Sequence, residues 1–178
     1  EPGGTLIGES IRELLQFAPH NKNMTPETEL LLFEASRSQL VREVITPALE
    51  RGVCVIADRF SDSTTVYQGA ARKLDREMIE SLNAFAVGDC IPDVTFALDV
   101  DAATAELRMR REPRKADRME QQPADFYERV REGYRELAAG EAKRFVMIDA
   151  SGDVEEIEKQ IWETLCSRFP VLAKVSNP

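Results

Sequence analysis

The chain has 178 residues, 43% of them apolar and 31% charged, with a formal net charge of −9. This composition excludes a disordered or low-complexity chain, and the surplus of acidic side chains argues against binding to a nucleic-acid polymer. No apolar run is long enough to cross a bilayer, so we expect no membrane partner. Small anionic substrates remain compatible with this charge if the few cations gather in one cleft.

The cysteines Cys54, Cys90 and Cys166 lie far apart, and the chain has a single histidine, His20. This spacing argues against a zinc site and against a disulfide framework. A reducing compartment fits such cysteines, and we therefore expect a cytoplasmic protein.

Helix and strand signals alternate along the chain. Helices are predicted over residues 7–17, 25–51, 75–87, 123–139 and 153–169, with a further one beginning at Asp101. Thr25 and Pro26 open the longest helix, Gly52 closes it, and Pro47 should kink it or mark its last segment. Continuous apolar runs predict buried strands over residues 53–57, 94–100 and 145–148.

This alternation is typical of βαβ crossovers. We therefore expect an α/β fold in a single domain of residues 1–178, with a parallel sheet flanked by helices. Three strands are few for such a sheet, which leads us to expect further strands ahead of Glu1.

Polar residues follow the first predicted strand, at the sheet edge where parallel α/β proteins bind ligands. There the carboxylate of Asp58 can serve a cation and the guanidinium of Arg59 a phosphate, or the two can form an ordinary ion pair. The residues after Phe60 are rich in hydroxyl and amide groups, which can read a nucleobase edge but also suit a helix N-terminus. The whole run DRFSDSTTVYQG, residues 58–69, favours a binding role over capping alone.

Phe33 and Arg37 lie four residues apart on the longest predicted helix and therefore face the same way. A ring followed by an arginine one turn later can stack on a base and hydrogen-bond to its edge. Core packing of Phe33 with a solvated Arg37 is the alternative.

The segment 108–120 is positively charged, whereas the chain as a whole is acidic. It contains Arg108, Arg110, Arg111, Arg114, Lys115 and Arg118. Because Pro113 breaks the helix, part of this segment is expected to be a loop. An arginine-rich loop suits closure over a transferring phosphoryl group, and a solvated helix surface is the alternative.

Over essentially its whole length the chain resembles bacterial thymidylate kinases. EPGGT at residues 1–5 is similar to that family's EPGG loop, LLFEASR at 31–37 to its thymine-contacting element, and DRFSDSTTVYQG to its fingerprint. The segment ending in DRME at 117–120 looks like the lid of the enterobacterial type. The resemblance implies a P-loop nucleoside-monophosphate-kinase fold, transfer of the ATP γ-phosphoryl group to dTMP with Mg²⁺, and a homodimer.

The resemblance also implies roles for individual residues. Arg59 and Arg12 bind the acceptor phosphate, Thr64 and Gln68 face the base, and Tyr67 crowds the 2′ position. The implied substrate-binding set is Glu1, Arg12, Phe33, Arg37, Arg59, Thr64, Tyr67 and Gln68. The implied catalytic set is Asp58, Arg111, Arg114 and Arg118, with Asp58 also organising the metal. Asp149 and Ala150 are placed near the donor adenine.

Two features depart from the family pattern. Lys73 stands where the family usually has glycine, which we interpret as a local loop variation. The phosphate-binding motif GxxGxGK[ST] does not occur in the 178 residues, and we expect it in a segment ahead of Glu1. Without that segment, we expect the 178-residue chain to have no kinase activity. The alternatives are a non-catalytic nucleotide-binding or scaffold protein and a kinase for another nucleotide.

Overall fold

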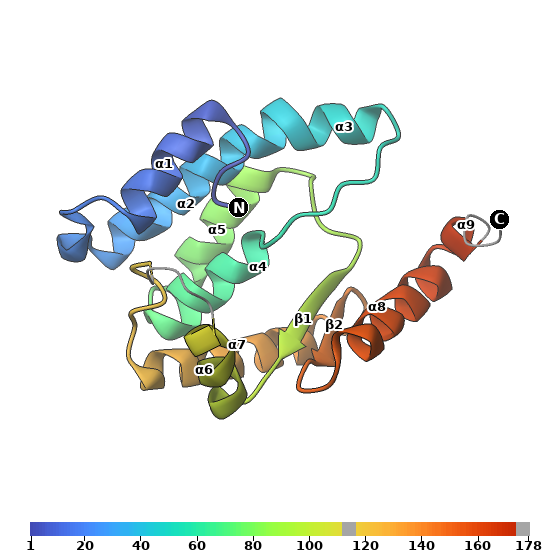
Figure 1. The fold of residues 1–178 in the computed structure, drawn as a ribbon. Coiled ribbons are helices and arrows are strands. Elements are labelled where there is room, and N and C mark those ends of the chain that lie inside the picture. The colour runs from blue at the N-terminus through green and yellow to red at the C-terminus, as the bar shows by residue number, and fades with distance from the viewer. Residues whose placement is uncertain (112–116, 174–178) are drawn as a thin grey trace. The chain divides into compact units, whose positions relative to one another are not determined.

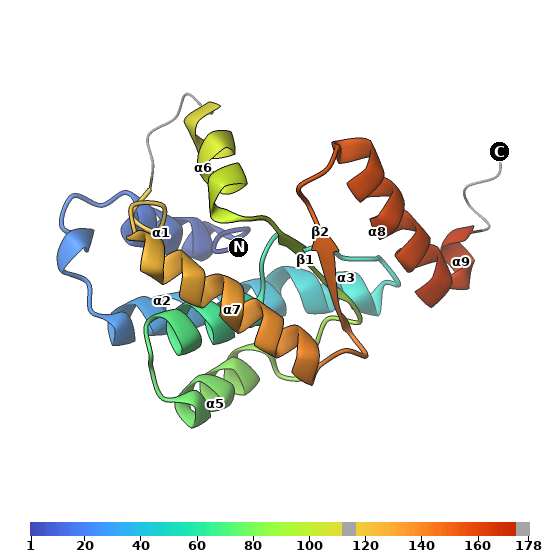
Figure 2. The same cartoon turned by 90° about the horizontal axis from the view of Figure 1, so that it is seen from below.

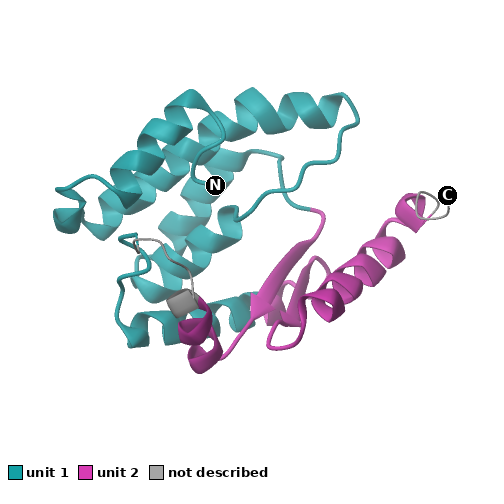
Figure 3. Cartoon of the chain, viewed as in Figure 1, with its two compact units in different colours: residues 1–92, 114–137 teal, residues 93–113, 138–178 magenta. Residues whose placement is uncertain are grey.

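A computed structural model describes residues 1–111 and 117–173. The chain forms two compact units (Figure 3). Unit 1 comprises residues 1–92 and 114–137, and unit 2 comprises residues 93–113 and 138–178. The single domain expected from the sequence stays a prediction, and each unit is described by itself.

Unit 1 is built from helices (Figure 1). In chain order they are α1 (Leu6–Gln16), the 3₁₀ turn η1 (Asn21–Asn23), α2 (Pro26–Leu40), the π-helical turn η2 (Val41–Ile45), α3 (Thr46–Glu50), α4 (Ser61–Thr64), the π-helical turn η3 (Thr65–Ala71), α5 (Arg76–Val87) and most of α7 (Ala124–Gly140). The capping residues act as predicted: Thr25 accepts a hydrogen bond from the amide of Thr28, and Asp75 from that of Met78.

The longest predicted helix, over residues 25–51, is present as α2, η2 and α3 in succession. Pro47 lies in α3, the last of these pieces, as predicted. Because proline has no amide hydrogen and its ring crowds the preceding turn, a widened turn just before it accommodates the break. Gly52 then ends the helix with a φ of +74°, a conformation that glycine adopts without strain.

The prediction of a strand over residues 53–57 is wrong. This segment is irregular, and the side chains of Val53 and Ile56 are 49% and 94% exposed. An apolar run predicts a preference for burial, but a strand forms only where a second strand accepts its backbone hydrogen bonds. Within residues 1–111 and 117–173, no strand pairs with this segment.

Two buried clusters form the core of unit 1. The first joins Val41 and Ile45 of η2 to Phe60 and Val87. The second joins η3 to α7 and consists of Val66, Ala71, Phe126 and Val130. Figure 2 shows α7 lying across the helical segment that contains η3. A Cβ atom at Gly133 of α7 would lie 2.9 Å from the Cβ of Ala70, so glycine there permits this close approach.

Unit 2 contains the sheet. Strands β1 (Thr95–Asp99) and β2 (Phe145–Asp149) pair in parallel, with Thr95 opposite Phe145 and Asp99 opposite Asp149. The unit also contains α6 (Ala102–Arg111), α8 (Val154–Arg168) and α9 (Pro170–Ala173). The predicted strands over 94–100 and 145–148 and the predicted helices are confirmed, as is the parallel α/β class.

The side chain of Asp101 accepts a hydrogen bond from the amide of Thr104 and so caps α6, as predicted. None of the helices in the described part of the chain combines the length and the apolar character needed to span a bilayer.

Candidate functional site

The run DRFSDSTTVYQG folds as a bend followed by a tight helical segment. Asp58 and Arg59 form the bend, Phe60 is extended, and α4 and η3 follow directly. Arg59 has a φ of +68°, which places it in the left-handed region. A residue with a Cβ atom is strained there, at a cost of about 1–3 kcal/mol, and such strain is concentrated at functional sites. The bend therefore positions Arg59 at an energetic cost.

Arg59 lies at the surface with its guanidinium carbon 4.9 Å from the ring centroid of Tyr67. Tyr67 is held in turn by edge contacts with Phe126 and Tyr134, at centroid distances of 5.9 and 6.4 Å. Loss of hydration opposes the charge on Arg59, but Tyr67, Tyr134 and Asp58 outweigh it and raise the pKa of the guanidinium. Arg59 is thus an accessible, fixed cation beside an aromatic surface, as an acceptor-phosphate ligand requires.

Thr64 and Gln68 are buried one helical turn apart. Thr64 ends α4, Gln68 lies in η3 and Arg72 is the C-cap of η3, so the three side chains follow one another at intervals of about one helical turn. The Thr64 hydroxyl has no hydrogen-bond partner among the described residues. Gln68 donates its Nε2 hydrogen to Glu29 at 2.7 Å.

Glu29 of α2 is the centre of a buried charge cluster, which we call the Glu29 cluster and which contains Glu29, Gln68, Arg72 and Arg118. Arg72 donates to both Glu29 oxygens, at 3.2 and 3.0 Å, and Arg118 Nη2 lies 2.6 Å from Oε2. Burial alone would raise the pKa of Glu29, but the hydrogen bonds from Arg72 and Gln68 and the charges of Arg118 and Arg72 lower it. Glu29 is therefore an ionised carboxylate.

A pocket of about 330 Å³ lies beside this cluster. Its lining residues are Lys22, Met24, Pro26, Glu29, Arg72, Arg118, Gln121 and Gln122. The lining is thus mostly polar and carries more positive than negative side chains, which suits a polar ligand better than an apolar one.

Arg37 is the centre of a second buried cluster, which we call the Arg37 cluster and which contains Arg37, Glu1, Glu34 and Asn83. The Arg37 guanidinium pairs with Glu1 at 2.9 Å and with Glu34, and it donates to Asn83 Oδ1 at 3.2 Å. Burial raises the pKa of Glu1, an effect that the charge and hydrogen bond of Arg37 oppose. Two of the predicted substrate-binding residues, Glu1 and Arg37, are thus brought together.

Phe33 is half-buried and belongs to neither core cluster, so its ring remains available for stacking. Arg12 donates to the carbonyl of Pro2 at 2.9 Å. Asp58 is exposed next to Arg59. Within the part of the chain described, no three His, Cys, Asp or Glu side chains gather into a metal site.

The remaining predicted residues lie in or next to the arginine-rich segment, or in unit 2. Arg118 is 11% exposed. It forms an ion pair with Glu29 and donates a hydrogen bond to the carbonyl of Leu15 at 3.0 Å. Arg111 ends α6, and its side chain, like the whole of Arg114, lies outside the described residues. The predicted lid, residues 108–120, is therefore described only in part. The catalytic roles of these arginines stay predictions.

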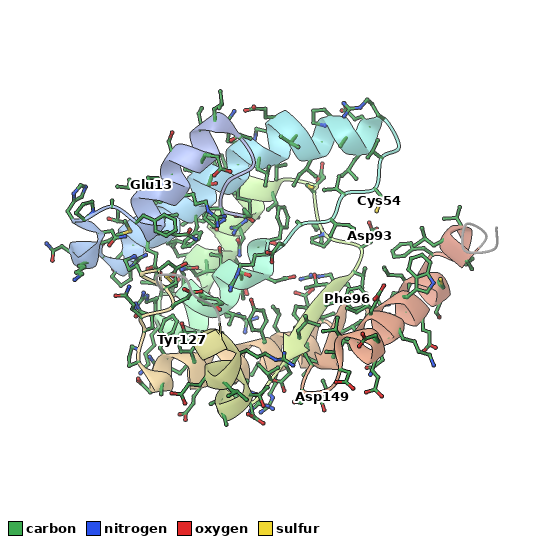
Figure 4. All side chains as sticks on the ribbon, viewed as in Figure 1. Glu13, Cys54, Asp93, Phe96, Tyr127 and Asp149 are labelled. Carbon is green, nitrogen blue, oxygen red and sulfur yellow. The ribbon has the colours of Figure 1, made fainter. Side chains whose placement is uncertain are left out.

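In unit 2, Asp149, labelled in Figure 4, ends β2. Its carboxylate accepts a hydrogen bond from the amide of Ser151 at 2.9 Å. The buried Ala150 donates its amide to the carbonyl of Asp99 and accepts from Arg108 at 2.8 Å. These bonds fix the backbone after the strand, at the sheet edge where parallel α/β proteins bind ligands.

Sequence reasoning missed three residues that hold the predicted site residues in place: Glu29, Arg72 and Asn83. Asn83 bridges α5 to Arg37 and to the hydroxyl of Thr65, at 3.1 Å. A signal for Glu29 was present, since it lies at intervals of four from Phe33 and Arg37 and therefore on the same helix face as these two predicted site residues. Arg72 and Asn83 carried no such signal, because their partners are distant in the sequence.

Comparisons of the sequence and of the structure with known proteins agree on one family. The family model described as thymidylate kinase matches residues 1–161. A thymidylate kinase of Kosmotoga olearia is 50% identical over 162 residues, covering 90% of this chain and 76% of that relative. One of Geobacter sulfurreducens is 46% identical over 175 residues, covering 96% and 82%. The crystal structure of thymidylate kinase from Ehrlichia chaffeensis is 35% identical with a TM-score of 0.72, covering 93% of this chain and 76% of that one.

Proposed function

The chain belongs to the thymidylate kinase family, and on that premise we propose that it transfers the γ-phosphoryl group of ATP to dTMP, giving ADP and dTDP. The family match includes every residue proposed below as an acceptor ligand. Such a transfer is direct and in line, so the protein contributes positioning and neutralisation of charge on the phosphoryl oxygens.

One observation carries the assignment of the base site. Thr64 is almost completely buried, yet its hydroxyl lacks a protein partner among the described residues. A buried polar group without a partner costs about 1–3 kcal/mol, and a ligand that supplies the partner recovers this energy. Thr64 lies one turn before Gln68 and five residues after the exposed Arg59, so a bound nucleotide meets hydroxyl, amide and guanidinium groups from one short segment.

We assign the substrate contacts as follows. Arg59 and Arg12 hold the acceptor phosphate, Phe33 stacks on the base, and Tyr67 crowds the 2′ position so that deoxyribose is preferred. Arg37 is assigned to the base edge and Glu1 to the ordering of Arg37, with which it pairs at 2.9 Å. Arg111, Arg114 and Arg118 are assigned to the transferring phosphoryl group, and Asp149 and Ala150 to the donor adenine.

Asp58 is the residue proposed to hold Mg²⁺. Mg²⁺ usually keeps several waters and takes one or two carboxylates together with substrate phosphates. A single exposed carboxylate beside a phosphate-binding arginine fits this demand, whereas an all-protein metal cage does not occur among the described residues. When bound, the ion neutralises phosphate charge.

We also infer a homodimer and a cytoplasmic location. Helices α2 and α5 pack against each other, and with η2 they leave apolar side chains exposed at Leu31, Val44, Met78 and Phe85. Apolar side chains gathered on neighbouring helices suit a subunit interface. The three cysteine thiols are unpaired, which fits a reducing compartment.

Binding and transfer are measured separately, because the 178 residues contain no GxxGxGK[ST] motif. Calorimetry with dTMP, dUMP, dCMP and dGMP tests acceptor recognition, and a coupled assay with ATP and Mg²⁺ tests transfer. We expect tight binding of dTMP. A folded protein that binds no pyrimidine deoxynucleotide contradicts the proposal.

Replacing Arg59 with Ala is expected to weaken dTMP binding by about 10- to 100-fold, because a charge-assisted hydrogen bond contributes about 1.5–3 kcal/mol. Thymidine lacks the phosphate, so its affinity should change little. Arg76→Ala is the matched control, since the Arg76 side chain is 88% exposed and pairs with its helix neighbour Glu80. Equal losses for dTMP and thymidine in Arg59→Ala remove the phosphate role.

A further inference from the structure

We propose that Glu29 is a positioning residue that fixes which way the Gln68 amide faces, so that the base pocket selects a pyrimidine carrying hydrogen on N3. The inference rests on the proposed function, in which Gln68 faces the base. It adds to that function a residue that selects among pyrimidines without touching the substrate.

The orientation of the Gln68 amide follows from the chemistry of its partner. An ionised carboxylate only accepts hydrogen bonds, so the Gln68 atom 2.7 Å from Glu29 Oε1 must be the nitrogen. The reverse orientation would place two acceptors against each other in a buried site, since both side chains are no more than 2% exposed. The amide oxygen of Gln68 therefore points away from Glu29.

Glu29 cannot turn to release the amide. Arg72 holds both of its oxygens, and Arg118 holds Oε2 from a second direction. Each arginine has a further anchor, Arg72 on Gln122 Oε1 at 2.8 Å and Arg118 on the carbonyl of Leu15 at 3.0 Å. Two guanidinium groups around one carboxylate also keep it ionised, and the lowered pKa of Glu29 agrees.

One hydrogen of the Gln68 nitrogen is held by Glu29, and the amide oxygen, which points away from Glu29, is the atom that we assign to the base. Within the described chain, no residue donates to Gln68 Oε1, and the hydroxyl of Thr64 one turn away is also without a partner. Thymine and uracil carry a hydrogen on N3 and satisfy a carbonyl acceptor. Cytosine carries a lone pair on N3, so it would leave Oε1 and N3 opposed and unpaired. Selection between these bases therefore depends on the fixed amide.

The test compares Glu29→Gln with wild type by measuring dissociation constants for dTMP, dUMP and dCMP. An amide at position 29 both donates and accepts, so the Gln68 amide can then take either orientation. We expect the preference for dTMP over dCMP to shrink at least tenfold, with dUMP following dTMP. Loosening of the fold alone would weaken all three nucleotides alike and would leave the ratio unchanged.

Glu43→Gln is the matched control. Glu43 also accepts from a glutamine amide, Gln39 Nε2 at 2.6 Å, but on the exposed surface of the same helical run. Its substitution should leave every dissociation constant unchanged. If Glu29→Gln fails to fold, Glu29→Asp keeps the charge for both arginines but withdraws the oxygens from Gln68, and the preference should again fall.

The outcomes separate this inference from the proposed function. A wild-type protein that binds no pyrimidine deoxynucleotide overturns the function itself. A wild-type protein that prefers dTMP, with a folded position-29 variant that keeps the full preference over dCMP, overturns only the role of Glu29.

Discussion

The two buried charge clusters of unit 1 contain opposite ratios of arginine to carboxylate. The Glu29 cluster surrounds one carboxylate with two arginines, whereas the Arg37 cluster surrounds one arginine with two carboxylates. In the first, the excess cations reach solvent, since Arg72 and Arg118 are 18% and 11% exposed. In the second, the Glu1 and Glu34 side chains are only 2% and 7% exposed. Excess positive charge is thus partly hydrated, whereas excess negative charge is not.

The pKa values reflect this difference. Hydrogen bonds and two positive charges lower the pKa of Glu29 in spite of its burial. Burial raises the pKa of Glu1, because a single arginine shared with Glu34 does not offset the lost hydration. The number of cations around a buried carboxylate therefore decides whether it stays charged, and in the Arg37 cluster the largest favourable contribution comes from one residue, Arg37.

The largest expected effect is that of Arg37→Met. Removing the arginine leaves two buried carboxylates without a cation, which costs about 3–5 kcal/mol of unfolding free energy. Arg42→Met is the control, since Arg42 follows α2 in η2 but is exposed, and among the described residues it bonds to Ser38 and to backbone carbonyls. We expect a loss of about 1 kcal/mol there. Urea unfolding measures both, and equal losses contradict the comparison.

The pH dependence of the Glu29 cluster is expected to be smaller. Because the pKa of Glu29 is lowered on folding, the unfolded chain takes up a proton at this position before the folded chain does. The stability that ionised Glu29 confers, about 1.5–3 kcal/mol for charged hydrogen bonds, is therefore present at neutral pH. It is lost as the pH falls below about 4.5 and on through the lowered pKa.

Urea unfolding of wild type and Glu29→Gln between pH 7 and pH 3.5 measures this contribution. The difference between the two should shrink steadily on acidification, whereas Glu43→Gln should match wild type throughout. A difference that is constant over this range shows that Glu29 stabilises the fold by packing and not by its charge.

The sequence predicted what depends on neighbours in the chain. Thr25 and Asp75 cap their helices as expected, because the amides they accept from lie three residues away. Strands β1 and β2 were also predicted correctly, whereas residues 53–57, equally apolar, form no strand. The apolar pattern is the same in both cases, and only the presence of a pairing partner distinguishes them.

The residues of the functional site also divide into those recognisable from their chain neighbours and those that depend on distant partners. Its motif residues could be predicted because they occur as contiguous strings, such as DRFSDSTTVYQG. The pairing that orients Gln68 could not, because Glu29 is 39 residues away, and the spacing of Glu29 with Phe33 and Arg37 does not point to Gln68. The π-helical turn η3, which carries Gln68, has no sequence signal of the kind that caps provide.

The smallest expected effect concerns Lys73, which follows the last turn of the segment that carries Gln68 and Arg72. Lys73 has a φ of +61°, a conformation that glycine adopts without strain. We expect Lys73→Gly to stabilise the protein by about 0.5–1 kcal/mol, because the released strain exceeds the entropy that glycine adds to the unfolded chain. Lys73→Ala removes the same exposed charge but keeps the Cβ atom, and it should give no gain. A thermal midpoint for Lys73→Gly no higher than that of Lys73→Ala shows that this turn stores no strain.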